Sequence, residues 1–199
     1  MHPNKSPKFL AMAKSIMPDE ADMLWQAASQ VPEGGTIVEI GSFRGSSTYA
    51  MALACEGRNV KIYAVDTWMG SPGGIDEWGP KRGVTSVGSF LPEFKNNLAE
   101  FINSGVVIPL EMSSAGALMC EPRLEPYLVF IDGSHVYEDV LFDVTYWWPR
   151  VKQGGAMAVH DTTGDKDWHP QVKQALDCFL KRNNLKLFRF FGCTSWLKK

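Results

Sequence analysis

The stretch that most constrains the fold is residues 37–48, which read Ile-Val-Glu-Ile-Gly-Ser-Phe-Arg-Gly-Ser-Ser-Thr. It opens with a β-branched run that suits a buried strand. Gly41 and Gly45 follow, and residues 49–54 are rich in alanine, methionine and leucine, which favour a helix. The pattern predicts a strand, a glycine turn and a helix, a unit in which the backbone and free helix N–H groups approach a ligand closely. The glycine spacing differs from the Gly-x-Gly-x-x-Gly of dinucleotide-binding proteins.

A second acidic position supports a ligand-binding role for this unit. Residues 61–65 have the pattern of a strand, and the strand ends in Asp66. An acid at the end of the next strand is where a nucleoside ribose is held by its hydroxyls. The alternative interpretation is a plain β–α turn that needs two glycines and binds nothing.

Four segments together resemble a known family. Residues 38–48 are similar to the first motif, and residues 63–68 to the acidic second motif, of class I S-adenosylmethionine-dependent methyltransferases. Residues 131–135 (Ile-Asp-Gly-Ser-His) and 159–161 (Val-His-Asp) resemble small bacterial O-methyltransferases related to macrocin O-methyltransferase and to cephalosporin hydroxylase-like proteins. The resemblance extends from residue 36 to the C-terminus.

The resemblance implies an α/β, Rossmann-like methyltransferase fold. We expect a seven-stranded, mostly parallel sheet with helices on both faces and an antiparallel C-terminal hairpin joined at Gly192. Residues 1–35 are predicted to form an N-terminal helical cap, divided by Pro18 into two helices, and residues 36–199 the S-adenosylmethionine-binding domain. The cap either covers the sheet or serves as a lid over the cofactor or a dimer contact. Beyond the first two strands, strands are expected at residues 106–110, 127–131, 157–159, 185–191 and 193–197, and helices at 90–102, 115–120, 137–148 and 170–182.

Composition excludes several classes of protein. The 199 residues are 45% hydrophobic and 21% charged, with a formal net charge of −2, so one domain with a real core is expected and a nucleic-acid partner is not. The four cysteines are scattered and form no Cys-x-x-Cys pair, which predicts reduced thiols in a cytoplasmic protein. No apolar run has the length of a membrane span, and the N-terminus has no signal-peptide core, so no membrane partner is expected.

The resemblance also implies where S-adenosylmethionine binds, since ligands of open α/β sheets lie at the carboxyl ends of the strands. Asp66 is expected to accept hydrogen bonds from both ribose hydroxyls, and Glu39 to orient the glycine loop through backbone N–H groups. The glycines let the methionine part lie against the backbone, and Ser47 and Thr48 are expected to bond its carboxylate. The cofactor-binding residues implied in this way are Glu39, Gly41, Ser42, Gly45, Ser47, Thr48, Asp66, Thr67, Ser114 and Asp132.

A second group of side chains follows the fourth and fifth strands. Asp132, His160 and Asp161 offer carboxylate oxygens and one imidazole, which suit Mg²⁺ or Mn²⁺ and also accept Zn²⁺ or Fe²⁺. Related O-methyltransferases hold a divalent ion with acids at these strand ends, so a metal site is predicted here, with Mg²⁺ as the expected ion. This chain has His160 where some members have a further acid. The alternative is that His160 is a base or a substrate contact.

His135 is a candidate catalytic base, because an imidazole of near-neutral pKa can take the proton of an acceptor hydroxyl. The alternative is that it caps the following helix or orients a loop. The long loop at residues 67–88 contains Trp68 and Trp78, which are expected either to flank the acceptor or to pin the loop to the surface. Lys81 and Arg82 in the same loop either hold an anionic acceptor or are solvated.

The predicted function is transfer of a methyl group from S-adenosylmethionine to a hydroxyl of a small molecule, such as a sugar or another natural-product intermediate, assisted by a divalent metal. One alternative is a metal-independent methyltransferase in which His135 or His160 is the base. Another is a non-catalytic nucleoside-binding protein of the same fold. The N-terminal helices and loops that would form the acceptor pocket are short, so a second subunit, as in a homodimer, is a candidate to complete the site.

Overall fold

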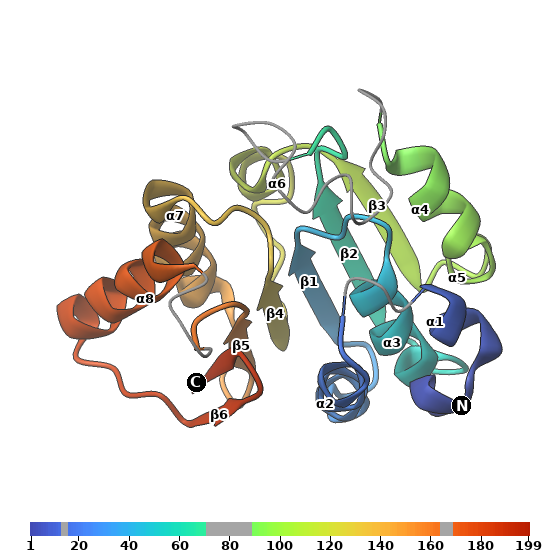
Figure 1. Ribbon diagram of the computed structural model, residues 1–199, viewed down its shortest axis with the longest axis horizontal. Coiled ribbons are helices and arrows are strands. Elements are labelled where there is room, and N and C mark those ends of the chain that lie inside the picture. The colour runs from blue at the N-terminus through green and yellow to red at the C-terminus, as the bar shows by residue number, and fades with distance from the viewer. Residues whose placement is uncertain (13–15, 71–88, 164–168) are drawn as a thin grey trace.

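A parallel sheet extended by a C-terminal hairpin forms the centre of the protein (Figure 1). The computed structural model describes residues 1–12, 16–70, 89–163 and 169–199, and within these ranges seven strands form one sheet of order β3-β2-β1-β4-β5-β7-β6. Strands β1 to β5 are parallel, and β7 pairs antiparallel with both β5 and β6. The strands are β1 (Thr36–Ile40), β2 (Lys61–Asp66), β3 (Val107–Glu111), β4 (Leu128–Ile131), β5 (Ala156–Val159), β6 (Arg189–Phe191) and β7 (Thr194–Lys198).

Helices cover both faces of this sheet, which confirms the predicted Rossmann-like fold with its terminal hairpin. One side carries α1 to α5, and the other carries α6 to α8. The helices are η1 (Pro3–Lys5), α1 (Pro7–Met12), α2 (Pro18–Ser29), α3 (Ser46–Cys55), α4 (Leu91–Asn97), α5 (Ala99–Asn103), α6 (Ser114–Cys120), α7 (Tyr137–Trp147), η2 (Trp148–Arg150) and α8 (Pro170–Asn183), where η marks a 3₁₀-helix.

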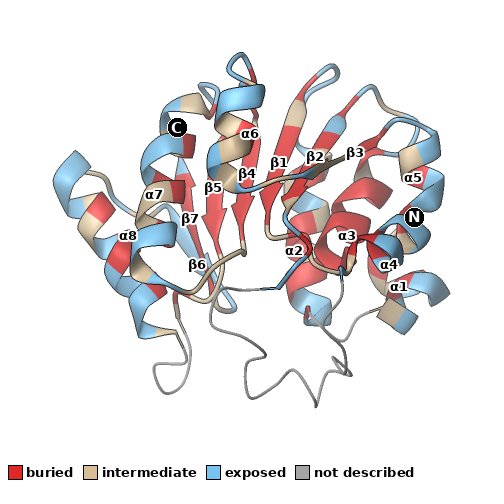
Figure 2. Cartoon of the chain, turned by 90° about the horizontal axis from the view of Figure 1, so that it is seen from above, coloured by how far each residue is buried: buried red, intermediate tan, exposed pale blue. Residues whose placement is uncertain are grey.

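Two apolar cores separate these helices from the sheet, because successive strand residues point to opposite faces. In β1, Ile37 packs into the core shared with α1 to α5, and Val38 into the core shared with α6 to α8. All four residues of β4 are buried, as expected for a central parallel strand covered on both faces. Figure 2 shows the buried residues concentrated in the strands and on the helix surfaces that face them.

The N-terminal helices pack against α3 and share its core. Phe9 of α1 and Leu24 of α2 are fully buried in that core. Pro18 occupies the first turn of α2, where its missing N–H costs nothing, and confirms the predicted start of this helix. The boundary at residue 35 between a cap and the cofactor domain stays a prediction.

Two predicted elements differ from those observed. The single helix expected at residues 90–102 is two short helices, because Leu98 leaves helical geometry with φ −101° and ψ 11°. The strand expected from residue 185 begins only at Arg189. None of the helices within the described ranges combines the length and the apolar character that a membrane span requires.

The long loop after β2 is described only as far as Gly70. Trp78, Lys81 and Arg82 lie outside the described residues, so their predicted contacts with the acceptor stay predictions. The prediction that Trp68 flanks the acceptor is wrong: its side chain is 1% exposed, packs against Phe94 and donates from Nε1 to the carbonyl of Phe43 at 2.7 Å. This tryptophan pins the start of the loop, which was the alternative interpretation.

Candidate functional site

The glycine turn after β1 lets two strand ends approach each other. Gly41 and Gly45 have φ values of +88° and +89°, in the left-handed region that favours glycine. A Cβ atom at Gly41 would overlap the backbone carbonyl of Asp132, and one at Gly45 would overlap Leu98. The turn therefore brings the backbone of β1 against the end of β4.

Glu39 supports this turn from inside the protein. Its carboxylate is fully buried and accepts hydrogen bonds from the hydroxyls of Ser42 at 2.7 Å, of Ser47 at 2.5 Å and of Thr48. Burial raises the pKa of Glu39 to about 7, although the hydroxyls oppose this rise. Glu39 was predicted to orient the loop by accepting hydrogen bonds from backbone N–H groups. This prediction is wrong about the donors, because they are side-chain hydroxyls.

These bonds bear on two predicted cofactor contacts. The hydroxyls of Ser47 and Thr48 point to Glu39, so a bond from either of them to the cofactor carboxylate would have to replace or share that interaction. Both residues lie in the first turn of α3, whose backbone N–H groups favour an anion. Contact between this turn and the cofactor stays a prediction, and the backbone is the better candidate to make it.

Asp66 lies at the end of β2, next to the glycine turn. Its Oδ2 accepts the backbone N–H of Phe43 at 2.8 Å, and its Oδ1 accepts that of Trp68 at 2.6 Å. The side chain is half-buried, and the neighbouring Thr67 is exposed. Each carboxylate oxygen keeps acceptor capacity beyond one hydrogen bond, so the ribose contact predicted for Asp66 is compatible with this geometry and stays a prediction.

The hydroxyl of Ser114, at the start of α6, is committed to α7. It accepts a hydrogen bond from Nε1 of Trp147 at 2.8 Å and also contacts the buried carboxyl of Asp143. Burial raises the pKa of Asp143 to about 7. The cofactor contact that the resemblance implied for Ser114 stays a prediction, and a hydroxyl with these partners contributes little to it.

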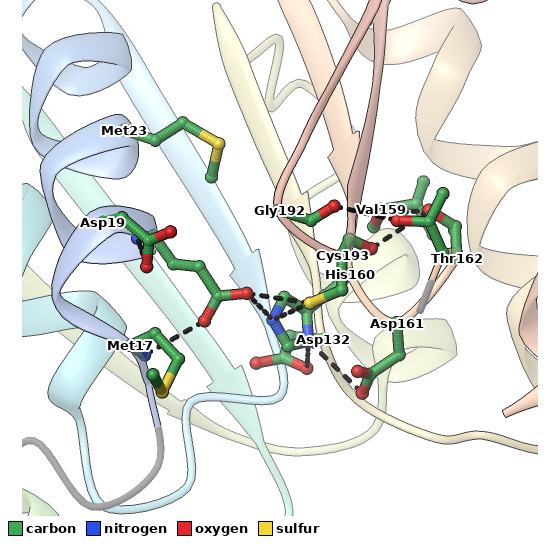
Figure 3. Close-up of polar contacts among 12 residues, drawn as sticks. Met17, Asp19, Met23, Asp132, Val159, His160, Asp161, Thr162, Gly192 and Cys193 are labelled. Atoms are coloured by element: carbon green, nitrogen blue, oxygen red, sulfur yellow. Dashed lines mark hydrogen bonds and ion pairs between the residues drawn. The ribbon is translucent and has the colours of Figure 1, made fainter. Parts of the chain in front are cut away.

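The ends of β4 and β5 bring Asp132, His160 and Asp161 together (Figure 3). Nδ1 of His160 lies 3.0 Å from Oδ1 of Asp132 and 3.2 Å from Oδ2 of Asp161. Asp161 has a φ of +55°, a conformation that costs a non-glycine residue energy and tends to occur at functional sites. The three side chains predicted to bind a metal are therefore adjacent.

The charges in this cluster are strongly coupled. Burial disfavours a charged His160, but Asp132 and Asp161 outweigh burial and raise the pKa of His160 far above its usual range. Burial likewise opposes ionisation of Asp161, yet His135 and His160 hold the pKa of Asp161 well below its usual range. Although Nδ1 of His160 is close to both carboxylates, neither approach has hydrogen-bond geometry among the described residues, and the atom is buried.

This donor set fits a divalent cation. The ligand atoms of Asp132, His160 and Asp161 all lie within 4.8 Å of one another. A buried imidazole nitrogen that faces two carboxylate oxygens without a hydrogen bond is arranged as a ligand for a positive centre between them. Two oxygens and one nitrogen suit Mn²⁺, Fe²⁺ or Zn²⁺ at least as well as Mg²⁺, because imidazole favours the transition metals.

His135 stands at the outer edge of this cluster. Its Nε2 lies 3.0 Å from Oδ2 of Asp161, and its ring stacks on that of His169 with centroids 3.7 Å apart. Burial and the neighbouring His135 lower the pKa of His169. The side chain of His135 is 37% exposed, so a substrate can reach it, whereas His160 is 13% exposed.

Two further residues reach His160 from the opposite side, and the sequence analysis missed both. Oε1 of Glu20, in α2, lies 3.1 Å from Nε2 of His160. The thiol of Cys193, in the C-terminal hairpin, donates to the same oxygen at 2.8 Å and lies 3.2 Å from Nε2. Burial opposes ionisation of Glu20, but its bonds with His160 and Cys193 outweigh it and hold its pKa at about 2. These contacts join residues that are 140 and 173 positions apart, so no local sequence pattern predicts them.

Comparisons with known proteins agree with this geometry. The family model for a methyltransferase domain matches residues 38–162, from β1 to just beyond Asp161. The solved structure of the O-methyltransferase NovP is similar with a TM-score of 0.68 and 20% sequence identity, over 92% of this chain and 81% of that one. For the calicheamicin methyltransferase CalS11 the TM-score is 0.67 at 18% identity, over 90% and 77% of the chains. For an O-methyltransferase from Bacillus cereus in complex with SAH it is 0.63 at 12% identity, over 96% and 87%.

Proposed function

Because the chain belongs to the family of methyltransferase domains, we propose that it transfers a methyl group from S-adenosylmethionine to a hydroxyl group of a small molecule, with a divalent cation held by Asp132, His160 and Asp161. The observation that carries the proposal is the meeting of these three side chains at the carboxyl edge of β4 and β5. The glycine turn and Asp66 lie on the same edge of the sheet. Ligands of open α/β sheets bind at this edge.

The cofactor half of the site is formed by β1, β2 and the turn between β1 and α3. The left-handed backbone at Gly41 and Gly45 turns the chain tightly at the carboxyl end of β1, and we place the methionine part of the cofactor against this turn. Asp66, already fixed by two backbone N–H groups, offers its remaining lone pairs to the ribose hydroxyls. The SAH held by the similar Bacillus cereus O-methyltransferase supports S-adenosylmethionine as the cofactor.

The acceptor half is formed by the residues after β4 and β5. A divalent cation bound by Asp132, His160 and Asp161 would lower the pKa of an acceptor hydroxyl and align its oxygen with the methyl group. His135 would take the hydroxyl proton as the methyl group moves to the oxygen and S-adenosylhomocysteine leaves. Asp161, bonded to Nε2 of His135, orients the ring for this role and leaves Nδ1 as the proton acceptor.

His135 suits the role of base better than His160. The ring of His160 is largely buried and both of its nitrogens face partners. Its Nδ1 faces the two acids and its Nε2 faces Glu20, so neither nitrogen is directed at an acceptor hydroxyl. His135 is more exposed, and its Nε2 pairs with Asp161.

The class of acceptor is suggested by the similar structures. CalS11 is a TDP-rhamnose 3′-O-methyltransferase from calicheamicin biosynthesis, and NovP is an O-methyltransferase. A sugar or another hydroxylated natural-product intermediate is therefore the acceptor we propose to screen first.

One observation favours a metal-independent enzyme as the second candidate. Between Asp132 and Asp161, a protonated His160 would itself carry the positive charge that a cation otherwise supplies. In that enzyme the acids would position the substrate and His135 would still take the proton. Turnover that persists after exhaustive chelation, and does not rise with added Mn²⁺ or Mg²⁺, would support this candidate over the metal-assisted one.

The decisive experiment is calorimetric titration of the protein with S-adenosylhomocysteine and S-adenosylmethionine, followed by turnover with hydroxylated acceptors. We expect micromolar binding in the wild type, and about 10- to 100-fold weaker binding in Asp66→Asn, the equivalent of losing hydrogen bonds to a charged group. Asp161→Asn should bind the cofactor normally and lose turnover. Asp177→Asn, which alters an exposed acid on α8, is the control.

Each failure has a distinct meaning. Absence of cofactor binding in the wild type would overturn the proposed reaction. Normal binding by Asp66→Asn would move the ribose site elsewhere. Full turnover by Asp161→Asn would remove the acceptor mechanism while leaving the cofactor site intact.

A further inference from the structure

We propose that Glu20, on the N-terminal helix α2, is the positioning residue for His160 in the metal site. The inference rests on the proposed function, since it assigns Glu20 to the histidine ligand of that site. The motifs that carry the family resemblance begin at residue 38, and Glu20 lies outside them and outside the matched segment 38–162. The structure nevertheless brings its carboxylate to 3.1 Å from Nε2 of His160.

The carboxylate of Glu20 is held rigidly. Its Oε2 accepts the backbone N–H of Met17 at 3.0 Å, which satisfies a free donor at the start of α2. Its Oε1 faces His160 and Cys193. The side chain is 7% exposed, so little water competes for these contacts. One oxygen thus anchors the group to the helix while the other reaches the site.

The C-terminal hairpin places the thiol of Cys193 next to both the same oxygen and Nε2 of His160 (Figure 3). The hydroxyl of Thr162 donates to the carbonyl of Cys193 at 3.2 Å, and the backbone N–H of Thr162 donates to that carbonyl at 2.9 Å. The hydroxyl of Thr163 donates to the carbonyl of Gly192 at 2.8 Å. The turn of the hairpin is therefore tied to the residues directly after Asp161.

The position of Glu20 determines whether Nδ1 of His160 carries a proton or a free lone pair. With Nε2–H donated to the Glu20 carboxylate, the lone pair of Nδ1 faces Asp132 and Asp161, which lie 3.0 and 3.2 Å away. A metal-binding histidine commonly donates its other N–H to a carboxylate, which fixes the ring and makes the ligating nitrogen more basic. In the proposed metal site, Glu20 is the carboxylate that accepts this second N–H of His160.

The test is the affinity for Mn²⁺ alone, measured by calorimetry or electron paramagnetic resonance without cofactor or acceptor. Glu20→Gln should weaken Mn²⁺ binding about 10- to 100-fold, the usual effect of losing such a partner. Glutamine also serves at this position of a capping box, so α2 keeps its start. Asp22→Asn is the matched control, because Asp22 lies on the same helix and pairs with a different histidine, His2. This variant should bind Mn²⁺ with an affinity within about twofold of the wild type. That change is smaller than the roughly tenfold loss expected at least when the partner of a metal ligand is removed.

A double-mutant cycle separates positioning from a general loss of stability. His160→Asp replaces the imidazole with a carboxylate and leaves Glu20 with no ring to hold. Adding Glu20→Gln to that variant should then change Mn²⁺ affinity less than about twofold, since the coupling between the two residues is gone. An equal loss in both backgrounds would overturn the inference.

The outcomes also separate this inference from the proposed function. Mn²⁺ binding by the wild type with an unchanged affinity in Glu20→Gln would overturn the role of Glu20 and leave the metal site standing. Failure of the wild type to bind Mn²⁺ would overturn the metal site itself and the role of Glu20 with it.

Discussion

A single buried carboxyl group, that of Glu39, governs how the first strand meets the glycine turn. Three hydroxyls bond to it, but none carries a charge to offset burial. Its pKa of about 7 means that the folded protein holds this proton through a range in which an unfolded chain has released it. The residue therefore links the stability of the glycine turn to pH.

The stability of the protein should consequently fall as pH rises from 4.5 to about 7. In this window the folded state binds more protons at Glu39 than the unfolded state, so the free energy of unfolding decreases with pH, by about 3 kcal/mol for this residue. Glu39→Gln should remove that share of the slope in urea unfolding measured across the window. The buried Asp143, whose pKa is also raised to about 7, should account for a second share, which Asp143→Asn removes.

An unchanged slope in Glu39→Gln would mean that the carboxylate is ionised in the folded protein throughout this range. Residue-level contacts of this kind were the least predictable from the sequence. The acid after β1 was identified, but its partners were expected to be backbone N–H groups. Side-chain rotamers in the first turn of α3 decide that outcome, and hydrophobic periodicity carries no information about them.

Among the elements, the turn from β1 to α3 has the strictest steric requirement. A side chain at Gly41 meets the backbone of Asp132, which cannot move without disturbing the end of β4. Gly57, in the loop after α3, has a similar φ of +73° but open space around its Cβ position. Alanine substitutions at the two glycines therefore distinguish the cost of left-handed strain, which both share, from the cost of steric overlap, which only Gly41 has.

Gly41→Ala should destabilise the protein by about 2 to 5 kcal/mol, the sum of left-handed strain and overpacking. Gly57→Ala should cost about 1 kcal/mol, because strain is its main penalty. Urea denaturation followed by circular dichroism measures both. Equal costs would show that the contact between the turn and β4 yields easily, in which case the turn is less constrained than the structure indicates.

At the level of elements the sequence was most informative where periodicity was strong. The strand patterns predicted β1, β2, β4 and β5 and the acids at their ends, because a buried parallel strand is nearly uniform in apolar character. The break at Leu98 between α4 and α5 was missed, since apolar spacing continues across it while the backbone does not. The sequence left two roles open for Trp68, because a tryptophan in a glycine-rich loop has the same pattern whether it faces a ligand or the core.

In the whole molecule, the N-terminal helices belong to the same core as the sheet. The fully buried Phe9 of α1 and the adjacent Leu10, which is 56% exposed, differ sharply although they are neighbours in sequence. Phe9→Ala should lower the free energy of unfolding by about 3 to 5 kcal/mol, as expected for a buried aromatic ring. Leu10→Ala should stay within about 0.5 kcal/mol of the wild type.

Chemical denaturation of the two variants tests whether the N-terminal region unfolds together with the rest. A Phe9→Ala variant as stable as Leu10→Ala would show that α1 is only loosely attached and that the sheet domain is independent of it. Two separate transitions in the wild type would also indicate a division near the predicted boundary at residue 35.

The overall topology and the family were predictable from the sequence, and both predictions are confirmed. The order of motifs along the chain was enough, because each motif follows a strand and parallel strands place their ends on one edge. The approach of Glu20 and Cys193 to His160 was not predictable, because it depends on how α2 and the hairpin fold back over the sheet. Long-range packing of this kind leaves no periodic signal in either segment.

The junction of Glu20, His160 and Cys193 has a consequence for synthesis of the chain. The ribosome adds Cys193 to the chain 173 residues after its partner Glu20. The strands and helices up to β5 can dock while translation continues, whereas this junction closes only after the hairpin has left the exit tunnel. A chain whose hairpin is not yet made would present Asp132, His160 and Asp161 without the contact between Glu20 and Cys193, so this junction is completed only once the hairpin has been synthesised.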